Sequence, residues 1–170
     1  MIQECSLLKV LAVFFRKPTK IHFIREISRE INLAQTSVRN HINKLKKENF
    51  VLERESKPFR GLVANRDNEK FLFYKKVYNL YSLFELKQEI ANKIAPNALI
   101  LFGSYQRGED IEESDIDLLI LSKVKKDLSV SKFEKQLNRK IHLTFIGKIE
   151  DLEKGVQNNI KNGVILDGRI

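Results

Sequence analysis

The stretch LFGSYQRGEDIEESDIDLLIL, residues 101–121, contains two apolar runs joined by a polar segment. The first run ends on a Gly-Ser pair that begins at Gly103, and the second opens on an Asp-x-Asp sequence that begins at Asp115. Short apolar runs bounded by turn residues are typical of buried strands. We therefore predict strands over residues 97–102 and 116–121.

The two aspartates of the second run, Asp115 and Asp117, lie one residue apart. Side chains two positions apart in a strand point to the same face, so the two carboxylates are neighbours and repel each other. A divalent cation relieves this repulsion, and Mg²⁺ prefers oxygen ligands and bridges substrate phosphates. We therefore predict a magnesium site here. The alternative is that both aspartates only solvate the start of the strand.

The Gly-Ser pair precedes a segment in which we expect a short helix from Tyr105 onward, capped by Ser104. The first N–H groups of a helix lack partners within the helix, and a glycine without a side chain lets a ligand approach the backbone. Gly103 and Ser104 are therefore candidates to bind phosphate. A phosphate site that faces paired carboxylates suits a nucleoside triphosphate together with its magnesium ion.

The combination of Gly103-Ser104, a ten-residue spacer and Asp115-x-Asp117 resembles the DNA polymerase β superfamily of nucleotidyltransferases. The surrounding sequence, with Arg107-Gly108-Glu109 and with Ser114 before the first aspartate, resembles that of the minimal nucleotidyltransferases of prokaryotes. The resemblance covers residues 96–170. It implies a Mg²⁺-dependent transfer of a nucleoside monophosphate, from ATP or another nucleoside triphosphate, to a hydroxyl group. It further implies catalytic and metal-binding roles for Asp115 and Asp117, and nucleotide-binding roles for Gly103, Ser104 and Arg107.

The same resemblance implies a small mixed sheet flanked by helices. It predicts a helix over residues 129–138, a strand over 140–146, a helix over 150–162 and a short final strand over 164–166. Members of the superfamily commonly carry a third carboxylate on the strand that follows Asp-x-Asp. In this sequence His142 and Thr144 stand there instead.

Two hypotheses follow from that departure. In the first, the domain is an active enzyme, and it acts as an antitoxin that modifies a cognate toxin protein, as minimal nucleotidyltransferases often do. In the second, the protein is a transcriptional regulator whose degenerate nucleotidyltransferase domain only binds nucleotide or mediates assembly. The intact Gly-Ser and Asp-x-Asp sequences favour the enzyme, whereas the missing third carboxylate favours the regulator.

The N-terminal part predicts three helices followed by a hairpin. Apolar residues recur at helical spacing up to Lys17, again over residues 21–31, and again from Ala34 to Phe50. Alternating residues over 50–56 and the returning segment over 62–65 predict the two hairpin strands. This order resembles a winged helix-turn-helix domain over residues 1–66. Such domains place the third helix in the major groove of duplex DNA and the hairpin, or wing, on the flanking backbone.

In the third predicted helix, Val38, Ile42 and Leu45 form the apolar stripe, and amides, hydroxyls and lysines occupy the opposite side. Such side chains bind base edges and phosphates. Ala34 stands where a Ser or Thr cap is usual. Winged helices also serve as protein-docking or dimerisation modules, which is the alternative. The resemblance assigns DNA-binding roles to Gln35, Thr36, Asn40, Asn43, Lys44 and Lys47 on the helix and to Lys57 and Arg60 on the wing.

The formal net charge of +9 is concentrated in the first half of the chain. Up to Ala95 there are 19 Lys and Arg against 10 Asp and Glu, and from Pro96 onward there are 12 against 12. This asymmetry favours an N-terminal part that binds a polyanion. A lysine-rich surface that promotes solubility is the alternative explanation.

Residues 67–94 predict one long connecting helix, capped by Asn68 and ended before Pro96. Two apolar stripes run along it, one through Phe71, Tyr74, Tyr78 and Tyr81 and the other through Val77, Leu80 and Phe84. A helix that is apolar on two faces is normally covered on two faces. Packing within the chain, a homodimer contact and an aromatic platform for nucleic acid are the three interpretations.

The sequence thus predicts an α+β protein with a winged helix over residues 1–66, a connecting helix over 67–95 and a nucleotidyltransferase domain over 96–170. A single cysteine, Cys5, cannot form an intramolecular disulfide, which fits a reducing cytoplasm. No stretch has the length of a membrane span. We read His22 and His41 as packing or surface residues. The expected partners are duplex DNA, a nucleoside triphosphate with Mg²⁺, a toxin protein and a second copy of the chain, with no membrane.

Overall fold

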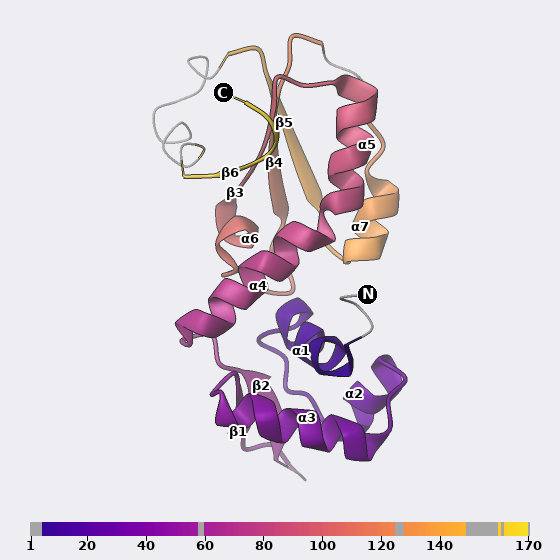
Figure 1. Ribbon diagram of the computed structural model, residues 1–170, viewed down its shortest axis with the longest axis vertical. Helices are drawn as coiled ribbons and strands as arrows, with labels where there is room; N and C mark the ends of the chain where they lie inside the picture. The colour runs from indigo at the N-terminus through magenta and orange to yellow at the C-terminus, as the bar shows by residue number, and fades with distance from the viewer. Residues whose placement is uncertain (1–4, 58–59, 125–127, 149–159, 161, 170) are drawn as a thin grey trace. The chain divides into compact units, whose positions relative to one another are not determined.

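The computed structural model describes residues 5–57, 60–124, 128–148, 160 and 162–169. The chain divides into two compact units, which comprise residues 1–75 and 76–170 and are treated one at a time below (Figure 1). Within the described ranges, no helix combines the length and apolar composition that crossing a bilayer requires.

The N-terminal unit consists of three helices followed by a two-stranded hairpin, in the predicted order. The strands pair antiparallel, with Val51 opposite Ala64 and Arg54 opposite Gly61. Lys17 caps the end of the first helix, directly before Pro18, which cannot continue a helix. The elements are α1 (Ser6–Arg16), α2 (Ile24–Glu30), α3 (Gln35–Lys47), β1 (Val51–Arg54) and β2 (Gly61–Ala64).

The core of this unit confirms the predicted apolar stripe of α3, because Val38, Ile42 and Leu45 are all buried. His22 is buried and His41 half-buried, which agrees with the prediction of packing or surface residues. His22 is buried with its Nε2 atom 2.9 Å from the Lys17 carbonyl oxygen, and its backbone pairs with Leu62 of the hairpin. The Nε2 atom of His41 lies 2.8 Å from the Ser6 hydroxyl.

The prediction of one helix over residues 67–94 is wrong at Leu83. The segment forms α4 (Glu69–Ser82) and α5 (Phe84–Ile94), and Leu83 between them is buried. The Ser82 hydroxyl donates to the Asn79 carbonyl oxygen at 2.7 Å, and the Leu83 N–H donates to Leu80 at 3.3 Å. A serine that bonds back to its own helix competes with the backbone ladder and bends the helix.

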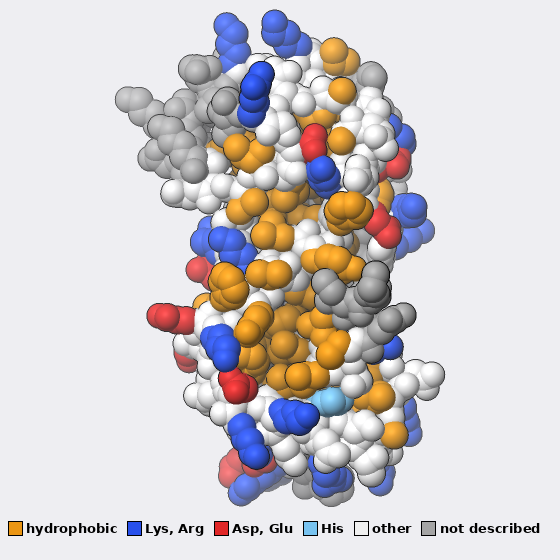
Figure 2. Space-filling view, viewed as in Figure 1, with side chains coloured by type: hydrophobic (Ala, Val, Ile, Leu, Met, Phe, Trp, Pro, Cys, Tyr) orange, Lys and Arg blue, Asp and Glu red, His pale blue; other side chains and the backbone are white. Residues whose placement is uncertain are grey.

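The start of α4 confirms the predicted cap, because the Phe71 N–H donates to the Asn68 side-chain oxygen at 2.9 Å. Within the single chain the two apolar stripes are not both covered, which leaves packing against a second copy as a prediction. Phe71 is buried, but hydrophobic side chains reach the surface over α4 (Figure 2). The exposed large hydrophobic residues of α4 and α5 are Phe73, Tyr74, Val77, Tyr81 and Phe84.

The C-terminal unit confirms the predicted small mixed sheet with flanking helices. Its strand order is β5-β4-β3-β6, in which β4 and β5 are parallel and the other neighbours antiparallel. Most of the helix predicted over 150–162 lies outside the described residues. The elements after α5 are β3 (Ala98–Phe102), α6 (Gly103–Arg107), β4 (Ile116–Leu121), α7 (Ser131–Leu137), β5 (Ile141–Ile146) and β6 (Val164–Gly168).

The two faces of the sheet are covered by different residues. Ile116, Leu118 and Ile120 of β4 join one apolar cluster with residues of α5 and α7, the two helices seen beside the sheet in Figure 1. Leu119 and Leu121 join a second cluster on the other face. Because side chains alternate along a strand, Asp115 and Asp117 share the face of Leu119 and lie at the beginning of β4.

Candidate active site and basic groove

The Gly-Ser turn and the Asp-x-Asp strand meet directly. Gly103 follows β3 with a φ angle of +78°, a conformation that favours glycine. A Cβ atom on Gly103 would lie 2.4 Å from the Oδ2 atom of Asp117, which is shorter than any ordinary contact. The site therefore requires glycine at this position for two reasons, the backbone conformation and the space that the Asp117 carboxylate occupies.

The helix after β3 begins earlier than predicted, so the prediction of a Ser104 cap is wrong. Helix α6 starts at Gly103 with Phe102 as its N-cap, and no side chain caps it. Phe102 is still extended, so the chain enters the helix directly from the strand. Ser104 lies in the first helical turn. The helix ends at Arg107 with Gly108 as its C-cap, and the Glu109 N–H donates to the Ser104 carbonyl oxygen at 3.0 Å.

Asp117 lies between two neighbouring strands, opposite Phe102 of β3 and opposite His142 of β5. Asp115 precedes β4, and its Oδ2 atom is 3.1 Å from the Nε2 atom of His142. The structure thus brings together the two predicted aspartates, Gly103 and the histidine that replaces the third carboxylate. Thr144 lies farther along β5, opposite Leu119, and is exposed.

The electrostatics of this cluster favour a bound cation. Burial raises the pKa of Asp117 above its ordinary value, the Asp115 carboxylate raises it further, and His142 opposes the change. A metal ion would relieve both the desolvation and the repulsion. Two carboxylates are a normal protein contribution to a Mg²⁺ site whose other ligands are substrate phosphates and water. No group of three or more His, Cys, Asp or Glu in the described ranges is arranged to hold a metal.

Arg107, a predicted nucleotide ligand, is exposed at the end of α6. Its Nε atom donates to the Glu109 carboxylate at 2.6 Å. Arg107 therefore lies on the same short helix as Ser104, and its guanidinium is bound by the Glu109 carboxylate.

A buried polar network supports the segment that leads to Asp115. The Asn79 amide donates to the Tyr105 carbonyl oxygen at 2.9 Å and to the Asp110 carboxylate at 2.8 Å. Arg139 pairs with the other Asp110 oxygen at 3.4 Å and also donates to the Glu112 carbonyl oxygen. The network fixes α6 and the following loop relative to β5. Sequence reasoning missed this network. The signal in the sequence was an acidic residue and an arginine, Asp110 and Arg139, in the segments that lead to predicted strands.

Asp115 also lines a hollow of about 700 Å³, which Asp117 does not line. The loop before β4 and helix α7 form its walls, and both acidic and basic side chains line it. Its lining includes Glu112, Ser114, Asp115, Glu134, Lys135 and Lys140.

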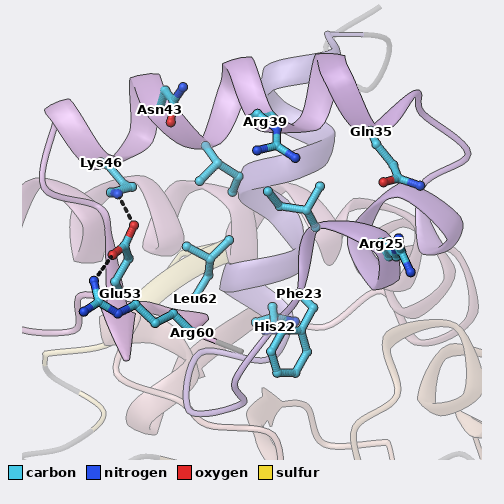
Figure 3. A pocket seen from close by; sticks show the side chains of 12 residues that line it. His22, Phe23, Arg25, Gln35, Arg39, Asn43, Lys46, Glu53, Arg60 and Leu62 are labelled. Atoms are coloured by element: carbon cyan, nitrogen blue, oxygen red, sulfur yellow. Dashed lines mark hydrogen bonds and ion pairs between the residues drawn. The ribbon is translucent and has the colours of Figure 1, made fainter. Parts of the chain in front are cut away.

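The N-terminal unit contains a groove of about 700 Å³ between α3, the start of α2 and the hairpin (Figure 3). One stripe of α3 faces it, at positions that are three or four residues apart. Ile42 and Leu62 contribute apolar surface to it. The polar side chains that line it are Arg25 of α2, Gln35, Arg39, Asn43 and Lys46 of α3, and Glu53 and Arg60 of the hairpin.

Of the predicted DNA-binding residues, the groove contains Gln35, Asn43 and Arg60. The others are exposed but do not line it, namely Thr36, Asn40, Lys44, Lys47 and Lys57. Sequence reasoning missed Arg25, Arg39 and Lys46. The helical spacing of Arg39, Asn43 and Lys46 is the signal that could have identified them.

Comparison with protein-family models matches residues 83–167 to the nucleotidyltransferase domain family. Comparison with curated proteins gives no match. The matched segment comprises half of the chain, begins just before α5, and contains Gly103, Ser104, Asp115 and Asp117. The prediction of a nucleotidyltransferase domain in the C-terminal part is thereby confirmed. The chain belongs to the nucleotidyltransferase domain family.

Proposed function

We propose that the C-terminal unit transfers a nucleoside monophosphate from a nucleoside triphosphate, which we take to be ATP, to a hydroxyl group of a protein or small molecule. The contact between Gly103 and Asp117 carries this proposal, because it joins the phosphate-binding turn to the carboxylate pair. Membership of the family supports nucleotidyl transfer in general.

The residues of the site divide the work of binding. Asp115 and Asp117 would hold Mg²⁺, and the backbone at Gly103 and Ser104 would receive the triphosphate. Arg107, at the end of the short helix that contains Ser104, would join the phosphates after leaving Glu109. When bound, the metal ion neutralises phosphate charge and polarises the phosphorus that is attacked.

In the proposed transfer, the acceptor oxygen bonds to the α-phosphorus as the bond from that phosphorus to the β-bridging oxygen breaks. Pyrophosphate leaves with the electron pair of the broken bond, and the hydroxyl proton passes to water. The hollow beside Asp115 offers space for an acceptor next to the carboxylates. Its mixed charge suits a polar acceptor, such as a hydroxyl side chain on a toxin protein.

His142 supports a second candidate function, a regulator that binds nucleotide without transferring it. Asp115 is 3.1 Å from His142, where a carboxylate would help to hold a second metal ion. Incubation with labelled nucleoside triphosphates, Mg²⁺ and cell lysate tests both functions. A labelled product that Asp117→Asn abolishes supports the transferase. Magnesium-dependent ATP binding without product supports the regulator, and no binding contradicts both.

We propose further that the N-terminal unit is a winged helix that binds duplex DNA. The groove between α3 and the hairpin supports this, because four cationic side chains line it beside amides that can read bases. Binding to mixed-sequence duplex DNA that weakens steeply with salt is the expected result. Binding that is absent at low ionic strength would leave protein docking as the role of the unit.

We propose a homodimer as the assembled form. The exposed apolar side chains of α4 and α5 support it, since large exposed apolar patches commonly mark interaction sites. Two copies would bring two DNA-binding units to one duplex. Light scattering that finds a monomer at high micromolar concentration, with and without DNA, would contradict this proposal.

A further inference from the structure

One carboxylate interrupts the positive charge of the basic groove. Four of the twelve lining residues are cationic, namely Arg25, Arg39, Lys46 and Arg60, and Glu53 is the one acidic residue in that lining. Glu53 of β1 lies between Lys46 of α3 and Arg60, which directly precedes β2, as Figure 3 shows. A carboxylate in this position faces whatever anion enters the groove.

Glu53 binds two of the four cations at once. Its Oε1 atom accepts a hydrogen bond from Lys46 Nζ, and its Oε2 atom lies 3.7 Å from Arg60 Nη1 (Figure 3). The hydrogen bond from Lys46 is the main reason that the pKa of Glu53 is lowered, so the side chain is ionised at neutral pH. Arg25 and Arg39, by contrast, form no ion pair with any carboxylate in the described parts of the chain.

The ion pairs of Glu53 with Lys46 and Arg60 can be broken at small cost. The side chains of Lys46, Glu53 and Arg60 are 37%, 43% and 73% exposed, and exposed ion pairs contribute little to stability because water screens them. A phosphate that approaches Lys46 or Arg60 can therefore displace the carboxylate at small cost. The displaced carboxylate remains in the groove and repels the same phosphate.

We propose that Glu53 competes with the phosphate backbone of duplex DNA for Lys46 and Arg60, and thereby limits sequence-independent binding. The proposal rests on the proposed DNA-binding function of the N-terminal unit. Affinity that does not depend on sequence comes from phosphate contacts, whereas base contacts discriminate between sites. When Glu53 binds Lys46 and Arg60, the contribution of phosphate contacts to affinity is lowered. Base contacts are then left to Arg39, Asn43 and Gln35.

The test uses Glu53→Gln in the full chain, with affinity for a mixed-sequence duplex measured across salt concentrations. Each added phosphate contact steepens the slope of log K against log salt by about 0.9, so two contacts add about 1.8. The ratio of the Glu53→Gln affinity to the wild-type affinity should therefore be about tenfold larger at 50 mM salt than at 200 mM. A fourfold change in salt raised to the power of about 1.8 gives this factor.

Glu30→Gln is the matched control. Glu30 also binds two cations, Arg16 at 2.9 Å and Lys17 at 3.2 Å, but it does not line the groove. Both variants change the net charge by the same amount. We expect the salt slope of Glu30→Gln to stay close to that of wild type, which would show that the effect of Glu53 is local to the groove.

A double-mutant cycle identifies the partners of Glu53. If Glu53 acts through Lys46 and Arg60, then Glu53→Gln has little effect when both cations are already replaced by alanine. The proposal is overturned if Glu53→Gln matches Glu30→Gln, or if it weakens binding because Glu53 orients the two cations for phosphate. It is also overturned if the slope is unchanged but the sequences selected from a randomised duplex pool change, which would make Glu53 a base-reading residue. A wild-type protein that does not bind duplex DNA refutes the proposed function itself, a different outcome from all of these.

Discussion

Gly103 lies so close to Asp117 that a single added methyl group would come within 2.4 Å of the Asp117 Oδ2 atom. Asp117 belongs to β4, and Gly103 directly follows the antiparallel neighbour β3, whose last residue, Phe102, pairs with Asp117. The sheet therefore places the two halves of the motif together, although ten residues separate Ser104 from Asp115 in the sequence. The segment between α6 and β4 therefore needs only to lead the chain back to the start of the antiparallel strand.

Gly103→Ala is expected to lose nucleotide binding and to destabilise the protein by more than about 1 kcal/mol, because alanine is strained at positive φ. The methyl group would also displace the Asp117 carboxylate. Calorimetric titration with ATP and Mg²⁺ checks the first effect and urea unfolding the second. Gly168→Ala is the control, since Gly168 also has a positive φ and a close backbone neighbour but lies at the end of β6. Gly168→Ala should retain nucleotide binding, and binding that survives in Gly103→Ala would contradict the prediction.

Asp117→Asn is expected to raise the melting temperature of the metal-free protein at neutral pH. Because burial raises the pKa of Asp117, the folded chain holds this proton more tightly than the unfolded chain does. The wild-type free energy of unfolding should therefore fall as pH rises from the ordinary aspartate range through the raised pKa. Asparagine does not ionise, so Asp117→Asn avoids this loss of stability. The melting temperatures of wild type and Asp117→Asn should therefore become equal only at acidic pH.

Added Mg²⁺ and ATP should stabilise the wild type and leave Asp117→Asn unchanged, because only a folded state that binds ligand gains stability from it. Glu113→Gln is the control for net charge, since Glu113 is an exposed residue of the same loop. Equal stabilisation of wild type and Asp117→Asn by the ligands would remove Asp117 from the metal site.

Asp110→Ala is expected to cost about 3–5 kcal/mol of stability, because it leaves the buried Arg139 guanidinium without its carboxylate. The neighbouring residue provides the contrast. Glu109→Gln breaks the exposed pair with Arg107 and should cost at most about 1 kcal/mol. Chemical denaturation measures both, and equal losses would mean that the buried network does not stabilise the loop before Asp115.

His142→Asp is expected to increase the rate of nucleotide transfer, because it would place a third carboxylate beside Asp117 and support a second metal ion. Thr144→Asp should not, since Thr144 lies opposite Leu119, farther from the pair. Initial rates with labelled ATP and the Mn²⁺ stoichiometry from electron paramagnetic resonance provide the readouts. A larger gain from Thr144→Asp would show that the second metal binds farther along β5.

Neutralising Lys44, Lys47 and Lys57 together should weaken binding to every duplex and flatten its salt dependence by about 0.9 for each lysine that contacts phosphate. Asn43→Ala should change the preferred sequence instead, because Asn43 lines the groove and its amide can read a base edge. Salt titrations and selection from a randomised duplex pool separate the two effects. Lysine substitutions that change only the preferred sequence would contradict the assignment.

The features that were predicted correctly depend on nearby residues. The α3 stripe of Val38, Ile42 and Leu45 follows from helical spacing, and the Asn68 cap follows from a side chain that reaches three residues ahead. The proximity of the Gly103 turn to Asp117 was expected from the spacing of the Gly-Ser and Asp-x-Asp motif. Hydrophobic periodicity and motif spacing are therefore enough to predict most elements and to bring together the residues at the centre of the candidate site.

The features that were missed depend on side chains that meet across long stretches of chain. Ser82 bends its helix and also contacts the Tyr105 hydroxyl, 23 residues away. The Asp110 carboxylate meets Asn79 and Arg139 across 31 and 29 residues. Nothing in the local sequence distinguishes these polar residues from solvated ones. The groove cations were missed for a related reason, since which stripe of α3 faces the hairpin is decided by packing.

The Asn79 network limits where the chain can be cut. The family match begins at residue 83, yet Asn79 and Ser82 lie before that point and bond to Asp110 and Tyr105. A fragment that starts at residue 83 would leave a buried carboxylate and a buried tyrosine hydroxyl without these partners. A fragment that starts at residue 76 would keep both. The shorter fragment should therefore unfold at lower temperature, so its failure to transfer nucleotide would say nothing about the chemistry of Asp115 and Asp117.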